Sequence, residues 1–474
     1  MSPSLRNALI AIGAALIACW AGWEIAEGSY VLPLLLALVC VVAVSSRLTG
    51  VGANVAFLGV LLVGYLVGNR GFAQLMPAPG LPLLPAELCL LVTVPWMIAQ
   101  AALARELPMR RDALNWAVLA WMVVGSARVM FDVRGYGLLA LRDFATVYYA
   151  AFFFVAQHLA RDPAARRHLL HAIMIGTIAI LPVFLLSEAF PAFFLERLRV
   201  LGVPLIYYKG DLVYTFMMVG AVLIFQWADG AARTAGKVFS VVLFLVVASS
   251  DSRASLLGGL VAMALLAASR RPRFAVLQGG AMAAAFVALV FVAQLTENSW
   301  AERKRDAVID RLVSVVDVSG VAVYRDAENA FKAGNNQFRL VWWRNVARET
   351  WAGNPLLGLG FGYDLARNFV REYSPDALDD FTARSPHSIL MTAFGRMGAL
   401  GLLSLLFVAG ALLQVTRRRL RTATAPLEWG VAVAPWVILT SACFGVVLEG
   451  PMGAVPFWVL LGLINAEAPD EAAA

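Results

Sequence analysis

Long apolar blocks recur along the whole chain, and they limit the folds that it can adopt. Each block is roughly 15–22 residues long, enough to cross a hydrocarbon core about 30 Å thick at about 1.5 Å per residue. Of the 474 residues, 61% are apolar and only 15% are charged, with a mean hydropathy of +0.75. Soluble globular proteins contain roughly 45–50% apolar and about 25% charged residues, and disordered chains are still more polar. The sequence therefore predicts an all-α membrane protein that crosses the bilayer many times.

Short basic gaps separate many of these blocks and predict which way the helices run. The strong gaps contain Arg105/Arg110/Arg111, Arg161/Arg166/Arg167, Arg270/Arg271/Arg273 and Arg417/Arg418/Arg419/Arg421, and the weaker ones contain Arg6, Arg47 and Arg233/Lys237. Because basic loops stay preferentially in the cytoplasm, we place all of these gaps there. The formal net charge of +7 is then explained by topology and does not indicate a nucleic-acid partner.

This placement predicts about 12–14 membrane spans with both termini in the cytoplasm, the lower number applying if 238–250 and 255–269 do not cross completely. The expected spans lie near 8–23, 29–45, 51–68, 83–104, 114–130, 138–160, 169–187, 211–228, 238–250, 255–269, 274–296, 387–415, 427–447 and 452–466. One long hydrophilic insert interrupts them and faces outside. We therefore divide the chain into N-terminal transmembrane helices at 1–296, a large outer loop at 297–386 and C-terminal transmembrane helices at 387–474.

The large outer loop has its own local patterns. Apolar residues recur at helical spacing over Glu302–Val316, and a second helix is expected over Phe338–Thr350. The glycine-rich run from Gly353 to Gly362 then predicts a turn. The loop is thus expected to contain short helices before the chain re-enters the membrane after Pro386.

A second set of cations lies on the face where the orientation rule disfavours them. These residues are Arg128, Arg134, Arg142, Arg197, Arg199, Lys209, Arg253, Arg339, Arg344 and Arg348. Cations near membrane depth are costly and usually face a polar cavity or a partner, so they indicate an anionic ligand on the outer side. Arginine suits a phosphate because its planar guanidinium offers two parallel donors. Structural ion pairs with the neighbouring Asp143 and Asp251 are the alternative for Arg142 and Arg253.

His387 is the one histidine of four that is expected outside, where the large outer loop meets the next helix. Its unperturbed pKa near 6.5 suits it to accept a proton from a sugar hydroxyl at neutral pH. A histidine with a purely structural role at the membrane interface is the alternative. The other three, at positions 158, 168 and 171, flank an inner arginine cluster.

The sequence indicates neither a metal nor a cofactor. The chain has no Walker-type glycine loop, HExxH or GxSxG motif. The nearest approach to a metal site is Asp376, Asp379 and Asp380, for which a solvated loop is the simpler interpretation. All four cysteines fall in apolar blocks, so we expect buried thiols and no disulfide at Cys19, Cys40, Cys89 and Cys443.

Three short motifs occur in order along the expected outer face. They are Ser249–Ser255, which contains Arg253; Arg339-x-x-Trp342 followed by Asn354–Gly360; and Pro386-His387-Ser388 leading into Gly398–Leu402. Together they resemble the O-antigen ligase and polymerase superfamily of bacterial envelope glycosyltransferases, over roughly residues 200–415. Two positions depart from the family pattern: Ser388 replaces an asparagine, and Arg396 stands where many members carry an acidic residue.

The resemblance implies an inverting, metal-independent glycosyl transfer at the periplasmic face of the bacterial inner membrane, without a cofactor. The donor would be a polysaccharide on undecaprenyl diphosphate, and the acceptor a sugar hydroxyl of lipid A–core, which makes the chain an O-antigen ligase. A polymerase or a protein O-oligosaccharyltransferase would use the same donor. Arg142, Lys209, Arg253 and Arg339, with Arg344 in reserve, would bind the diphosphate, and His387 would be the general base. The sequence does not indicate an oligomeric state.

A transporter of an anionic lipid is the alternative from another class, because buried arginines also line transport pathways. Transporters commonly show internal repeats and a pair of interrupted helices in corresponding halves. The sequence shows no repeat, and we expect no such pair of interrupted helices. The displaced cations also lie on one face only, whereas a transporter offers its site to both faces in turn.

Overall fold

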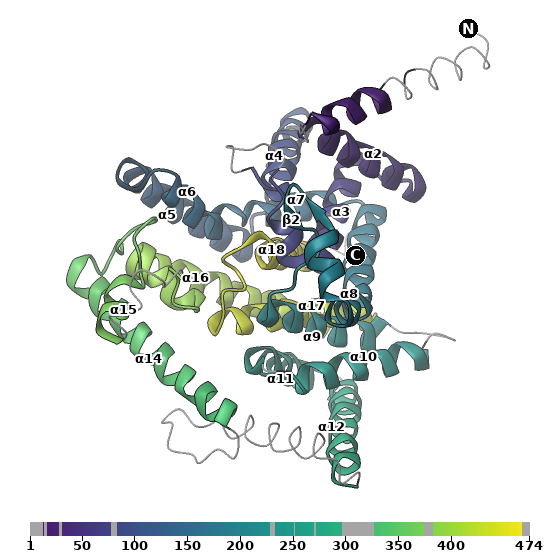
Figure 1. Cartoon of the computed structure of the whole chain (residues 1–474), viewed down its shortest axis with the longest axis vertical. Coiled ribbons are helices and arrows are strands. Elements are labelled where there is room, and N and C mark those ends of the chain that lie inside the picture. The colour runs from purple at the N-terminus through teal and green to yellow at the C-terminus, as the bar shows by residue number, and fades with distance from the viewer. Residues whose placement is uncertain are drawn as a thin grey trace.

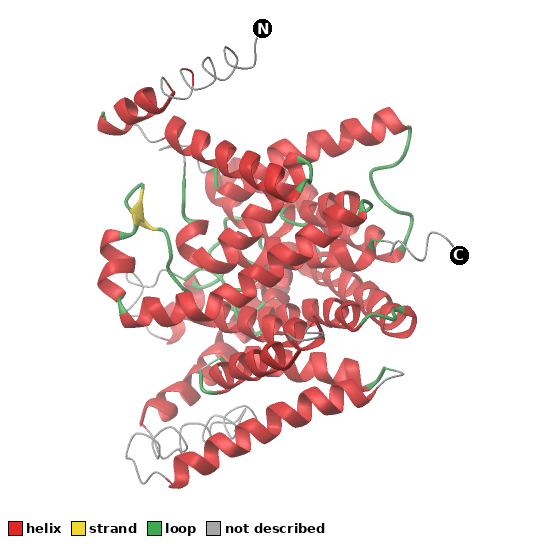
Figure 2. Ribbon diagram, turned by 90° about the vertical axis from the view of Figure 1, so that its right-hand side faces the viewer, coloured by secondary structure: helices red, strands yellow, loops and turns green. Residues whose placement is uncertain are grey.

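The computed structural model describes residues 13, 17–27, 31–76, 83–227, 233–250, 252–269, 272–295, 327–373 and 383–466. Figure 2 shows that this part of the chain is almost entirely helical. Its strands are β1 (Arg199–Val200) and β2 (Val203–Pro204), which form a short antiparallel pair. The predicted all-α fold class is confirmed.

The helices follow the apolar blocks closely. They are α2 (Val31–Thr49), α3 (Ala53–Ala73), α4 (Pro85–Ala104), α5 (Ala113–Tyr136), α6 (Leu138–Tyr148), α7 (Ala151–Leu159), α8 (Pro163–Ala189), the π-helix η1 (Phe193–Arg197), α9 (Gly210–Trp227), α10 (Arg233–Ala248), α11 (Arg253–Ala267), α12 (Pro272–Leu295), α14 (Ala327–Gly353), α15 (Arg367–Tyr373), α16 (Ile389–Thr422), α17 (Pro426–Cys443) and α18 (Pro451–Asn465). Among the described residues, eight helices are long and apolar enough to cross a membrane, counting α6 and α7 as one, and four shorter helices are also apolar. The chain is therefore a polytopic membrane protein. Most of the expected span at 8–23, and all of the helix expected over Glu302–Val316, lie outside the described residues.

The core of the bundle is built from helices that are apolar on every side. Helices α9, α17 and α18 lie near the centre of the molecule in Figure 1, and most of their residues are buried. A helix that is hydrophobic all round is stable only when other helices or lipid cover it. Here α9 packs against α8, α10, α11 and α17, while α18 packs along α7 and α3.

Helix α16 is interrupted at Gly398, and the glycine-rich turn fills the interruption. Gly398 has a φ of 63° and a ψ of −155°, a backbone conformation that L side chains rarely adopt. The turn supplies new backbone hydrogen bonds to the interrupted helix: Leu359 N to Gly395 O at 2.7 Å, Gly360 N to Arg396 O at 3.1 Å, Ala399 N to Pro355 O at 2.8 Å and Leu400 N to Leu356 O at 3.2 Å. The predicted turn at 353–362 therefore does more than end α14: its backbone groups pair with the groups of α16 that the interruption leaves without a helical partner.

Helix α3 is interrupted in the same manner, close to its C-terminal end. Asn69 has a φ of 51° and a ψ of −125°, and its side-chain Oδ1 accepts a hydrogen bond from the Lys209 N–H at 3.2 Å. The backbone of Tyr207 forms two hydrogen bonds with the residues on either side of this interruption. Its carbonyl oxygen accepts from Gly71 N and its N–H donates to Gly68 O, at 3.2 Å each. The expectation that the chain lacks a pair of interrupted helices is wrong, because local composition does not reveal a break that distant backbone groups satisfy.

Part of the segment predicted as the large outer loop forms a small aromatic core beside α16. Trp342 of α14 stacks on Phe369 of α15 with ring centroids 5.0 Å apart, and its indole donates a hydrogen bond to Leu365 O at 2.8 Å. Trp343 donates to Pro386 O at 2.7 Å, which ties α14 to the segment that contains His387. Figure 1 shows α14 and α15 beside α16. The helix predicted over Phe338–Thr350 lies within α14.

We expect the substitution Gly398→Ala to destabilise the protein, because a Cβ there would lie 2.4 Å from the backbone of Leu356 and the left-handed conformation would be strained. Strain of this kind costs about 1–3 kcal/mol, before the steric clash is added. Gly410→Ala on the same helix is the matched control, since its Cβ would meet no atom within 4 Å. Thermal unfolding in detergent should show a lower midpoint for Gly398→Ala only. Equal midpoints for the two variants would contradict the tight contact between the turn and α16.

Candidate functional site

A cavity of about 530 Å³ lies where the interrupted ends of α3 and α16 meet α6 and the loop between α17 and α18. Five cationic side chains line it, together with one histidine and two carboxylates. These are Arg70, Arg142, Lys209, Arg384 and Arg396, then His387, then Asp143 and Glu449. The lining therefore has an excess of positive charge, which suits a ligand with several negative charges. We call this space the cationic cavity.

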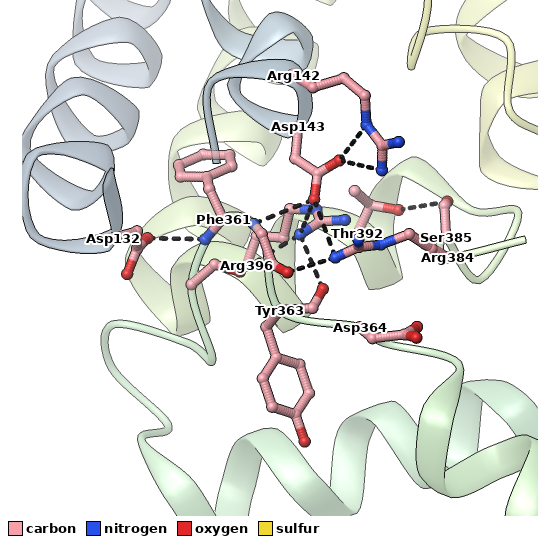
Figure 3. Close-up of polar contacts among 12 residues, drawn as sticks. Asp132, Arg142, Asp143, Phe361, Tyr363, Asp364, Arg384, Ser385, Thr392 and Arg396 are labelled. Atoms are coloured by element: carbon pink, nitrogen blue, oxygen red, sulfur yellow. Dashed lines mark hydrogen bonds and ion pairs between the residues drawn. The ribbon is translucent and has the colours of Figure 1, made fainter. Parts of the chain in front are cut away.

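Asp143 is the central acceptor of this cluster (Figure 3). Its Oδ2 atom lies 2.8 Å from the Arg396 guanidinium and 3.9 Å from that of Arg384, and it accepts a hydrogen bond from Gly362 N at 3.1 Å. Its Oδ1 atom accepts from Arg142 at 3.2 Å. One carboxylate is thus shared by three arginines, so their positive charge is only partly neutralised.

Arg396 is the buried member of the cluster, with 4% of its side chain exposed. Its guanidinium also lies near two carbonyl oxygens of the turn, Gly360 O at 3.4 Å and Tyr363 O at 3.3 Å. A charge this deep is tolerated only when it is paired and hydrogen-bonded. The departure from the family pattern at position 396 is therefore accommodated by Asp143 on α6.

Arg142 shows the ion pair that the sequence offered as a structural alternative, yet 59% of its side chain remains exposed. Arg384 also binds backbone, donating to Gly362 O, and 22% of its side chain is exposed. These two guanidiniums are therefore accessible from the cationic cavity, while Arg396 holds the turn in place.

His387 occupies a restrained position in the cavity wall. Its backbone is left-handed, with a φ of 53°, and its ring lies against the Trp342 indole with centroids 5.6 Å apart. Burial lowers the pKa of His387 to about 4, with the nearby Arg339 and Lys209 acting in the same direction. The imidazole is therefore uncharged at neutral pH and free to accept a hydrogen bond or a proton.

The structure brings some of the expected site residues together and separates others. Arg142, Lys209 and His387 line the cationic cavity, and Arg339 lies near enough to affect the pKa of His387. Arg253, the first residue of α11, instead lines a separate apolar cavity of about 240 Å³ bordered by α9, α10, α11 and α12. Arg344 is exposed on α14 and does not line the cationic cavity. Asp251, the possible partner of Arg253, lies outside the described residues.

Five charged lining residues were not among the expected site residues: Arg70, Asp143, Arg384, Arg396 and Glu449. A signal was present for Arg70, because it directly follows an expected span on the outer side, and for Arg384, which precedes His387 by three positions. Nothing in the sequence connects Glu449 with His387, because 62 residues separate them. Only the packing of α18 against the rest of the bundle makes that connection.

Among the described residues, no group of three or more histidine, cysteine, aspartate or glutamate side chains is placed to hold a metal ion. The aspartates at 376, 379 and 380 lie outside the described residues. All four cysteines are free, but Cys19 and Cys40 are exposed rather than buried. An apolar block predicts a helix that lipid can cover, and it does not say which of its side chains face the lipid.

Residues 238–406 match the family model described as O-antigen ligase. The matched region runs from α10 to the first part of α16 and includes Arg253, Arg339, Arg396 and His387. Over these residues the chain is similar to the O-antigen ligase superfamily. No curated protein matches the chain.

The depressed pKa of His387 predicts a loss of stability in mild acid. Between pH 6.5 and about 4 the unfolded chain binds a proton at His387 that the folded chain excludes, so stability falls as the pH decreases through this range. His387→Asn removes the titrating group, and asparagine tolerates the left-handed backbone. The unfolding midpoint in detergent should therefore decrease more for the wild type than for His387→Asn between pH 7.5 and 5. An equal decrease would mean that folding does not lower the pKa of His387.

Proposed function

We propose that this protein is an O-antigen ligase that transfers a polysaccharide from undecaprenyl diphosphate to a sugar hydroxyl of lipid A–core. The transfer would take place at the periplasmic face of the bacterial inner membrane. The observation that supports it most directly is the cationic cavity, which combines accessible guanidiniums with an uncharged imidazole. His387 and Arg396 from this cavity lie within the matched O-antigen ligase region.

The donor side of the reaction needs cations at a fixed distance from the leaving group. When the glycosyl–oxygen bond to the diphosphate breaks, its electron pair stays on the diphosphate, whose negative charge then increases. Preorganised positive groups lower the barrier for this step because they are already oriented before the charge develops. We assign this role to Arg142, Lys209 and Arg384, together with Arg70, an exposed lining residue that lies over the Tyr207 ring at 5.7 Å.

The acceptor side centres on His387. An uncharged imidazole accepts a hydrogen bond from the attacking hydroxyl and orients its oxygen toward the anomeric carbon. Direct attack from the face opposite the diphosphate would invert the configuration at that carbon and needs no covalent intermediate. Neither a nucleotide nor a metal ion is required in this scheme, since the diphosphate linkage stores the driving force.

The apolar cavity beside α11 suits the lipid part of the donor. Met218, Leu260 and Phe286 are among its apolar lining residues, whereas Ser250 and Arg253 are polar. We propose that part of the polyprenyl chain lies in this cavity. Arg253 would then lie beside the lipid part of the donor, apart from the cations that we assign to the diphosphate.

The two interrupted helices are the one observation that favours a transporter. In transporters, however, such breaks meet near the middle of the membrane. Here Asn69 lies four residues before the end of α3 and Gly398 nine residues after the start of α16. The break in α3 therefore lies at a helix end, and the residues beside the two breaks, Arg70 and Arg396, line the cationic cavity.

Loss of an accessible cation should slow the transfer by about 10²–10³-fold, the usual effect of removing one donor that stabilises developing negative charge. We expect this for Arg142→Ala and Lys209→Ala, measured with purified protein in detergent, lipid-linked polysaccharide donor and lipid A–core. Arg348→Ala is the matched control, because Arg348 is an exposed arginine of α14 that does not line the cationic cavity. Detergent removes the membrane barrier, so product formation also separates an enzyme from a transporter. Absence of product with the wild-type protein would contradict the proposed function.

Deletion of the gene distinguishes the three possible acceptors. For a ligase, electrophoresis of the lipopolysaccharide should show lipid A–core alone, with lipid-linked polymer accumulating in the membrane. Core carrying a single repeat would indicate a polymerase instead. A normal ladder together with an underglycosylated protein would indicate an O-oligosaccharyltransferase.

A further inference from the structure

The loop between α17 and α18 contributes a carboxylate to the cationic cavity. This carboxylate belongs neither to the cations assigned to the diphosphate nor to the imidazole assigned to the acceptor. Glu449 lies in that loop and is half-buried. Its Oε1 atom accepts hydrogen bonds from the hydroxyls of Ser385 and Thr392, the latter at 3.0 Å. The carboxylate is therefore held in one orientation by two neutral donors.

The same short segment holds both Glu449 and the imidazole. Ser385 precedes His387 by two residues, and Trp343 fixes the intervening Pro386 through its carbonyl oxygen at 2.7 Å. Thr392, on the first turn of α16, completes the contact, with its hydroxyl 3.3 Å from that of Ser385. Glu449 and His387 consequently line the same cavity on a common support.

The surrounding charges make His387 and Glu449 unequal as proton acceptors. An imidazolium at His387 would add a positive charge beside Arg339 and Lys209 in a partly buried site. A protonated Glu449 is neutral, and burial favours that form. Burial raises the pKa of this carboxyl, although the hydrogen bonds from Ser385 and Thr392 and the charges of Arg396 and Lys209 oppose the shift. Glu449 is thus the better final acceptor for a proton that leaves an attacking hydroxyl.

We propose that Glu449 is a second catalytic residue of the transfer and that its carboxylate holds the acceptor proton when the step is complete. The inference rests on the proposed function. In the step, the bond between the anomeric carbon and the diphosphate oxygen breaks, and its electron pair remains on the diphosphate. A new bond forms between that carbon and the acceptor oxygen, whose proton passes to Glu449, while His387 orients the hydroxyl by accepting its hydrogen bond.

The deciding variant is Glu449→Gln, because glutamine retains an oxygen for Ser385 and Thr392 but cannot accept a proton. The rate of transfer in detergent should fall by about 10²–10⁴-fold, the usual contribution of a general base. Binding of undecaprenyl diphosphate, measured by calorimetry, should change by less than about threefold. Glu188→Gln is the matched control, since Glu188 is an exposed residue of α8 outside the cationic cavity.

Two results would overturn the proposal. Transfer by Glu449→Gln at the wild-type rate would show that the proton goes elsewhere. Equal losses of transfer and of undecaprenyl diphosphate binding, with an unchanged unfolding midpoint, would show that Glu449 only positions the cations. If the wild-type protein forms no product, the proposed function itself is wrong. That outcome is distinguishable from the two results above, because both of them require an active wild type.

A chemical rescue keeps the test decisive if Glu449→Gln does not fold. Formate is a small carboxylate that can enter the space left by Glu449→Ala and accept the proton. It should raise the transfer rate of that variant at least tenfold without changing its affinity for undecaprenyl diphosphate, and it should not affect the wild type. Failure of formate to restore transfer in folded Glu449→Ala would overturn the proposal.

Discussion

The buried ion pair between Arg396 and Asp143 is the interaction on which the cationic cavity depends. It joins α16 to α6, and the carbonyl oxygens of the glycine-rich turn complete the coordination of the guanidinium. Removing one member of a buried pair typically costs about 3–5 kcal/mol, because it leaves the other charge unpaired in a poorly solvated place. The pair thus explains why a turn, a broken helix and a second helix meet at one point, and why Arg142 and Arg384 gather there.

The charges of the cavity have complementary roles. Five cations face two carboxylates, so the space retains positive charge for an anionic ligand. Burial, with Arg339 and Lys209 acting in the same direction, keeps His387 uncharged, which suits it to a neutral hydroxyl rather than to a phosphate. A site for a lipid-linked diphosphate and an attacking sugar needs both properties close together, and neither property alone would separate an enzyme from a simple anion-binding surface.

Sequence reasoning succeeded where the signal is local. Within the described residues it located the ends of the apolar helices to within seven residues, and it also located the helix that contains Trp342 and the turn at 353–362. It also selected Arg142, Lys209 and His387, which line one cavity although they come from distant segments. It did not anticipate the break at Asn69, which a loop 140 residues away stabilises, or Glu449, whose partner Ser385 lies 64 positions earlier. Nor did it separate Arg253, beside an apolar cavity, from the cations of the polar one.

The amino-acid sequence by itself determined that this chain forms apolar helices, and it predicted which of its cations depart from the orientation rule. Both properties follow from the free energy of transferring one segment at a time between water and lipid. Only the tertiary structure decided which of those cations meet, which carboxylates accompany them and which helices break. These outcomes depend on pairing buried polar groups between segments that are remote in the chain, and a partner for such a group exists only once the helices have packed.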